Sequence, residues 1–138
     1  MECLTLIRPV LVKVKVTENY KKTATAELQE AVHRIDMELQ RLAYQEKRLM
    51  ADLEKKNPSG APAVRDQVQN ERFRLEENRR KLFDRLKEIG ALALGAEVIY
   101  GKMESPVEVR VGDLWKHVLN TEIILQDGII TEIRQSSV

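Results

Sequence analysis

Three charged residues occupy positions of this sequence where apolar residues are expected, and they are the first candidates for chemistry. Glu46, Arg72 and Arg79 fall within two rows of otherwise apolar residues that are spaced alternately by three and four. A carboxylate beside guanidinium groups in such rows predicts a salt bridge between two helices, which specifies their register more than it stabilises them. The functional alternative is that this region opens to bind a partner, or is completed by another copy of the same helices.

Other side chains that could react are few and scattered. The two histidines, His33 and His117, have no second ligand at metal-binding spacing, and Cys3 is the only cysteine, so no intrachain disulfide can form. The glycines form no phosphate-binding loop, and no nucleophile with a base stands out. We therefore expect a protein that is not an enzyme, with no catalytic, metal or cofactor site, although a site assembled only on folding is an open alternative.

The two rows predict the arrangement of the helices that carry them. They mirror each other about a point between Gly60 and Ala61, so that positions whose numbers add to 121 face each other. The spacing is that of a coiled coil, and the short Pro- and Gly-rich tip at 57–62 requires antiparallel packing. The rows are Leu28, Val32, Ile35, Leu39, Leu42, Glu46, Leu49, Leu53 and Val68, Arg72, Leu75, Arg79, Leu82, Leu86, Ile89, Ala93.

The two ends of the chain have the two-residue period of β-strands. Val10 to Val16 alternates valines with Lys13 and Lys15, whereas Pro9 is expected to separate this strand from a short one at 4–7 or to lie at an edge. Asp127-Gly128 between apolar runs predicts a tight β-hairpin turn. Further strands are expected over 97–103, 107–111, 122–126 and 129–134, with one short helix over 112–119.

These elements predict an α+β fold. Residues 1–17 and 94–138 are expected to form one small β head, either an open sheet or a closed barrel, because neither segment buries its apolar face alone. Residues 18–93 are expected to form a long antiparallel coiled-coil helical hairpin that protrudes from this head, with helices over 18–56 and 62–92.

Apolar residues on the outside of the hairpin predict a contact surface. Met37 and Tyr44 are seven residues apart on the outer positions of the first helix, and Phe73 points outward from the second. Exposed apolar side chains at this spacing favour a homo-oligomer, formed through this stripe or through an open sheet edge in the head. A different protein partner at the hairpin is an alternative.

Basic residues on the second helix raise a different alternative, an RNA- or ribosome-associated factor. They are Arg72, Arg74, Arg79, Arg80, Lys81, Arg85 and Lys87. Acidic residues are interleaved with them and the whole chain has a net charge of only +1. Nucleic acid is therefore a less favoured partner, because a nucleic-acid-binding domain usually carries a strong basic excess.

The composition of the 138 residues favours a cytoplasmic protein with no membrane partner. No apolar stretch approaches the roughly 20 residues that cross a bilayer, and the N-terminus lacks the pattern of a signal peptide. Charged residues make up 33% and aromatic residues 4%, as expected of surface-rich helices with aliphatic contacts. A single cysteine fits a reducing compartment.

The order of these segments resembles that of the YlqD-like family of bacterial proteins. The resemblance covers nearly the whole chain and is most distinctive in Val111-Gly112-Asp113-Leu114-Trp115, followed by the Asp127-Gly128 hairpin. The family has no assigned biochemical activity, so the resemblance implies a fold and supplies no catalytic residues. Some members are encoded near ribosome-maturation genes, which slightly favours a translation-linked partner.

Overall fold

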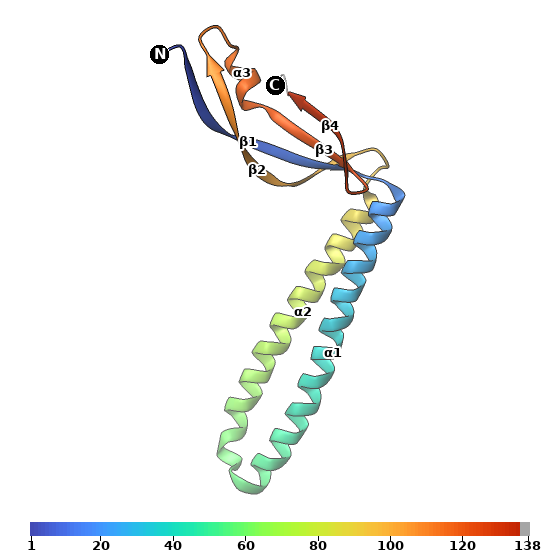
Figure 1. Cartoon of the computed structure of the whole chain (residues 1–138). Coiled ribbons are helices and arrows are strands. Elements are labelled where there is room, and N and C mark those ends of the chain that lie inside the picture. Colours follow the sequence, from blue (N-terminus) through green and yellow to red (C-terminus); the bar gives the residue numbers. More distant parts are fainter. Residues whose placement is uncertain (136–138) are drawn as a thin grey trace. The chain divides into compact units, whose positions relative to one another are not determined.

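The computed structural model describes residues 1–135 and has an α+β fold, with two long helices and a four-stranded sheet (Figure 1). It comprises two compact units: the hairpin unit, Lys22–Ala91, and the sheet unit, Met1–Lys21 with the described residues from Leu92 onward. The elements in chain order are β1 (Cys3–Lys15), α1 (Glu18–Lys56), η1 (Pro58–Gly60), α2 (Ala61–Ala91), β2 (Glu97–Arg110), α3 (Trp115–Leu119), β3 (Thr121–Gln126) and β4 (Ile129–Gln135).

The two long helices run side by side in opposite directions, as the mirrored rows predict (Figure 1). Helix α1 begins after Thr17, whose Oγ1 accepts a hydrogen bond from the backbone N–H of Tyr20 at 3.0 Å and so satisfies one free donor of the first turn. It ends at Lys56, where Asn57 and Pro58 start the 3₁₀ turn that reverses the chain. The predicted tip and helix ends are confirmed to within about a residue.

The core of the hairpin unit lies between the two rows. Val32 on α1 and Val68 and Leu75 on α2 are buried, and Leu75 is only 4% exposed. Most other row members are half-buried, as expected for two helices with no third layer, and Leu49 is 47% exposed. Contact along this single seam leaves the outer sides of both helices open to solvent.

The sheet unit is built around the N-terminal strand. The strand order is β2-β1-β3-β4, in which β1 pairs antiparallel with β2 and parallel with β3, while β3 pairs antiparallel with β4. Segments from both ends of the chain thus share one sheet, as predicted. Of the two alternatives for its form, the structure has an open sheet, with β2 and β4 at its edges.

Of the two alternatives for Pro9, the interruption of the strand is wrong, and the position at an edge fits the structure. Strand β1 is continuous from Cys3 to Lys15, and Pro9 lies opposite Glu104 of β2. Pairing with β3 starts only at Val10, so β1 has a neighbour on one side alone up to Pro9. A residue without an N–H group is tolerated where one side of the strand needs no donor.

The prediction of two separate strands over 97–103 and 107–111 is also wrong. Strand β2 runs unbroken from Glu97 to Arg110, through Ser105 and Pro106, and Pro106 lies opposite Ile7. Because β2 is an edge strand, one of its sides has no ladder to maintain, and proline is compatible with that position.

The core of the sheet unit is small. Val10, Val12, Val14 and Val16 are all buried, as their alternation predicts, and Ile124 of β3 is the most buried large side chain after Val16. The short helix α3 is confined to Trp115–Leu119, and the backbone oxygen of its Val118 accepts a hydrogen bond from Arg8 Nη1 at 3.3 Å.

The turn between β3 and β4 has the predicted conformation. Asp127 and Gly128 have φ of 49° and 80°, the two left-handed residues that a type I′ turn needs. The Asp127 carboxylate also accepts a hydrogen bond from Thr17 Oγ1 at 2.7 Å, so the turn is attached to the start of α1 within the sheet unit.

Candidate interaction surfaces

A network of ion pairs joins all four strands of the sheet. Lys13 of β1 pairs with Glu122 of β3 at 3.0 Å, and Arg134 of β4 approaches Glu122, Glu132 of its own strand and Glu97 of β2. The ladder pairs Glu122 with Arg134 directly, so these side chains lie on one face. They belong to segments far apart in the sequence, and the spacing of residues along the chain provides no signal for them.

The contact between Arg134 and Glu97 also reports the shape of the sheet. Their strands are separated by two others, about 14 Å in a flat sheet, which is farther than the two side chains comfortably span. The sheet is therefore strongly twisted on this face. The hydrogen bond from Arg134, helped by the charges of Lys13 and Lys15, holds the pKa of Glu97 below its ordinary value of 4.5, and the same bond raises the pKa of Arg134.

Large apolar side chains are exposed over much of the sheet unit. On β4, Ile129, Ile130 and Ile133 are 67%, 57% and 68% exposed. Other exposed residues of the unit are Leu4, Ile7, Leu94, Ile99, Tyr100, Met103, Val111, Leu114, Trp115 and Leu119. Exposed apolar surface of this extent is typical of surfaces that bind another protein.

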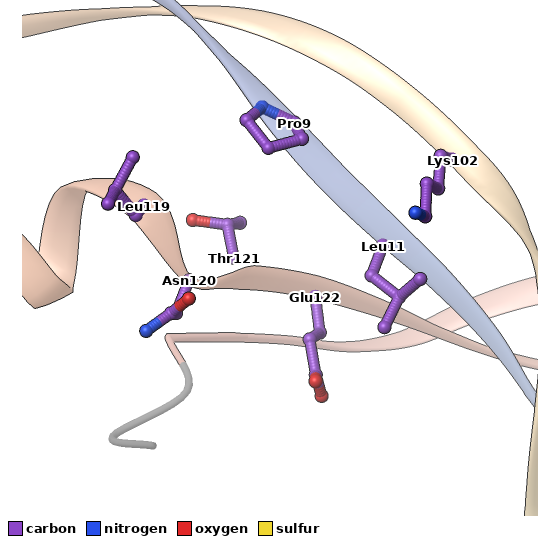
Figure 2. A pocket seen from close by; sticks show the side chains of 7 residues that line it. All are labelled: Pro9, Leu11, Lys102, Leu119, Asn120, Thr121 and Glu122. Atoms are coloured by element: carbon purple, nitrogen blue, oxygen red, sulfur yellow. The ribbon is translucent and has the colours of Figure 1, made fainter.

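One hollow lies where β1, β2 and β3 meet the end of α3 (Figure 2). Its volume is about 240 Å³, and it is lined by Pro9, Leu11, Lys102, Leu119, Asn120, Thr121 and Glu122. The only carboxylate, Glu122, is already paired with Lys13. Thr121 is buried and its hydroxyl oxygen has no hydrogen-bond partner. The polar side chains of the hollow are those of Lys102, Asn120, Thr121 and Glu122.

The charged residues in the helical rows form two ion pairs. Arg72 Nη2 lies 2.6 Å from Glu46 Oε2, and both side chains are about one quarter to one third exposed. The sequence placed both arginines beside Glu46, but only Arg72 pairs with it. Arg79 instead pairs with Asp36 at 2.7 Å and lies over the ring of Phe83 at 4.7 Å, because its side chain extends along the seam to the residue that flanks the first row.

The three predicted surface residues of the hairpin are exposed but not gathered together. Met37 and Tyr44 lie one above the other on α1, whereas Phe73 projects from α2. The guanidinium of Arg48 lies 5.9 Å from the centre of the Tyr44 ring, within cation–π range. Met37 and Tyr44 thus share one face of α1, with the exposed Arg41 between them.

The residues considered for metal or thiol chemistry are dispersed. His33 is exposed on α1, His117 on α3, and Cys3 near the start of β1. Among residues 1–135, no three His, Cys, Asp or Glu side chains are placed to hold a metal ion. None of the helices in this range combines the length and the hydropathy of a membrane-crossing segment.

The fold and these surfaces can be compared with known proteins. The family model of the YlqD protein matches residues 4–134, nearly the whole chain. The chain belongs to the YlqD family. A crystal structure of a protein of unknown function from Synechococcus sp. WH 8102 is similar over 96% of both chains, with a TM-score of 0.79 and 26% identity. No curated protein matches this YlqD family member.

Proposed function

We propose that this YlqD family protein is a non-enzymatic assembly module that associates with further copies of itself. The observation that carries the proposal is the number of large apolar side chains that the sheet unit leaves exposed, compared with the number that it buries. More large apolar side chains are exposed than are buried, since the buried ones are Val10, Val12, Val14, Val16, Val118 and Ile124.

The energetics favour covering this surface. Removing one aliphatic side chain fully from water stabilises a protein by about 1.5–3 kcal/mol. The three exposed isoleucines of β4 alone therefore represent several kcal/mol in gross terms, before the entropy lost on association is subtracted. Apolar surface on this scale is typical of proteins that bind another protein.

The hairpin unit supplies a second candidate surface. We propose that its two helices form a coiled coil and that Met37, Tyr44 and Phe73 contribute to contacts between copies, with the α1 pair as the centre. The Glu46–Arg72 pair would then set the register within each hairpin and leave the outer positions for association. A cytoplasmic location is part of the same proposal, on the ground of the single cysteine.

The RNA- or ribosome-associated alternative has less support from the geometry. Four of the arginines on α2 already have carboxylate partners, which reduces the positive charge available to phosphates. They are Arg72, Arg74, Arg79 and Arg80. An enzymatic role is a third alternative, and none of the contacts among residues 1–135 described above favours it over association.

Light scattering of the full chain against concentration tests the proposal. We expect a mass that is a multiple of the 15.9 kDa chain. A mass of one chain at every concentration would contradict self-association. A variant with Met37, Tyr44 and Phe73 changed to Glu, compared with Gln40→Glu as a charge control, assigns the contribution of the hairpin. A lower mass places part of the contact there, and an unchanged mass places it on the sheet unit.

A further inference from the structure

Strand β4 has a free edge. Within the part of the chain that the structure describes, β3 is its only neighbour, with Glu122 opposite Arg134 and Ile123 opposite Ile133. The backbone groups on the outer side of an edge strand can pair with the strand of another chain. An edge that also exposes apolar side chains is especially suited to such pairing, and Ile133 is 68% exposed.

The other edge of the sheet is protected in ways that β4 is not. Strand β2 contains Pro106, which has no donor, and Lys102, whose charge opposes pairing. Each edge strand has one register shift, near Tyr100 in β2 and near Thr131 in β4, so the shifts do not distinguish the two edges. Strand β4 contains neither proline nor lysine, and its residues from Glu132 to Gln135 pair regularly with β3.

From this contrast we infer that β4 pairs antiparallel with β4 of a second copy of the chain, with Ile133 opposite Ile133 across a two-fold axis. The pairing would join two four-stranded sheets into one of eight strands. It rests on the proposed self-association and names the surface and the register by which that association occurs. A two-fold axis through one residue makes both halves of the contact identical.

The charges of β4 select this register. With Ile133 at the axis, Glu132 lies opposite Arg134 of the second copy, and the same pair repeats on the other side. Opposite charges that face each other across two strands stabilise the pairing, and like charges destabilise it. An axis at Glu132 or at Arg134 would set two like charges against each other.

The existing contacts of these residues are compatible with the pairing. Glu132 is 56% exposed, so its carboxylate is accessible to a second chain. Arg134 already contacts Glu97 and Glu122, but a guanidinium has five donors and can serve a further carboxylate. The axis residue Ile133 would bury its side chain against its own copy.

Cysteine cross-linking tests the register directly. In a full-length Cys3→Ser background, Ile133→Cys places two thiols opposite each other, and directly opposed residues of an antiparallel pair have Cα atoms about 4.5–5.5 Å apart, within disulfide range. We expect oxidised glutathione to convert most of this variant into covalent dimer. The matched control is Ile130→Cys, whose two copies would lie about 20 Å apart and remain unlinked.

A charge variant provides a second measurement that needs no oxidation. Glu132→Arg sets arginine against Arg134 of the second copy twice, and we expect it to weaken dimerisation by about tenfold or more. The control Glu104→Arg makes the same change on an exposed residue of β2 and is expected to leave the dimer constant unchanged. Equal weakening by both variants, with circular dichroism unchanged, would overturn the choice of β4.

The outcomes separate this inference from the proposed function. A wild-type chain that remains monomeric contradicts both. A wild-type chain that self-associates, while Ile133→Cys is folded and fails to cross-link, contradicts only the β4 pairing. Cross-linking of Ile130→Cys to the same extent as Ile133→Cys contradicts the register.

Discussion

The helical seam makes a quantitative prediction at Leu75. This residue is 4% exposed on α2, so Leu75→Ala removes most of a buried side chain and leaves a cavity. Such changes cost about 2–5 kcal/mol. Because only two helices meet here and their open sides can move inward, we expect the lower part of that range, about 2–3 kcal/mol.

Leu49→Ala is the matched control in the same hairpin. Leu49 belongs to the mirrored row on α1 but is 47% exposed, so its replacement forfeits about half of the transfer free energy, roughly 1 kcal/mol. Both substitutions introduce the same residue into a helix interior. A difference in helix propensity therefore cannot account for a difference between them.

Urea unfolding followed by circular dichroism at 222 nm measures both variants, since the two long helices dominate this signal. With a slope of about 1–2 kcal/mol per molar urea, Leu75→Ala should lower the midpoint by about 1–3 M and Leu49→Ala by about 0.5–1 M. Protein concentration must be the same throughout, because association shifts apparent stability. Equal shifts, or a larger shift for Leu49→Ala, would refute the burial of Leu75 between the two helices.

Two further predictions concern the glycines and the ion-pair network. Gly128→Ala should destabilise the sheet unit by about 1–2 kcal/mol in thermal unfolding, because φ is 80° at this position. Gly90→Ala should stabilise helix α2 by about 0.5–1 kcal/mol, because the added Cβ meets no atom within 4 Å. Because the pKa of Glu97 is lowered on folding, the native state binds fewer protons, so its contribution to stability is present above pH 4.5 and is lost as the pH falls through the lowered pKa. Fluorescence-detected urea unfolding should show this acid loss in the wild type and a smaller one in Arg134→Gln.

Local signals predicted the helices and turns because each depends on a few neighbouring residues. The Thr17 cap, the Pro58 stop and the Asp127-Gly128 turn all act within four residues of the chain. The two mirrored rows then predicted the antiparallel reversal, since a six-residue tip allows no other return.

The strand breaks expected at the prolines are absent because the effect of a proline on a strand depends on distant segments of the chain. Pro9 and Pro106 lack an N–H group, but whether that matters depends on whether a neighbouring strand needs the donor. This depends on the strand order, in which β1 has one partner at Pro9 and β2 is an edge. The strand order depends on contacts between both ends of the chain, so no short stretch of sequence predicts it.

The candidate surfaces were predictable in part. Helical spacing identified Met37 and Tyr44 as outward-facing and Arg72 as a partner of Glu46. It missed the pairing of Arg79 with Asp36, because long side chains reach beyond the layer that a simple register assigns. It also missed the network around Arg134, whose partner Glu97 is 37 residues away in the chain.

The chain leaves the sheet unit and returns to it at nearly the same point. Val16 and Ala96 are joined by a backbone hydrogen bond of 2.8 Å, and Lys21 Nζ donates to the backbone oxygen of Leu92 at 2.8 Å. The seventy residues between Lys21 and Leu92 are thus an insertion between β1 and β2, two strands that pair directly with each other. A change in the length of this insertion by whole heptads would therefore leave every strand of the sheet with the same neighbour.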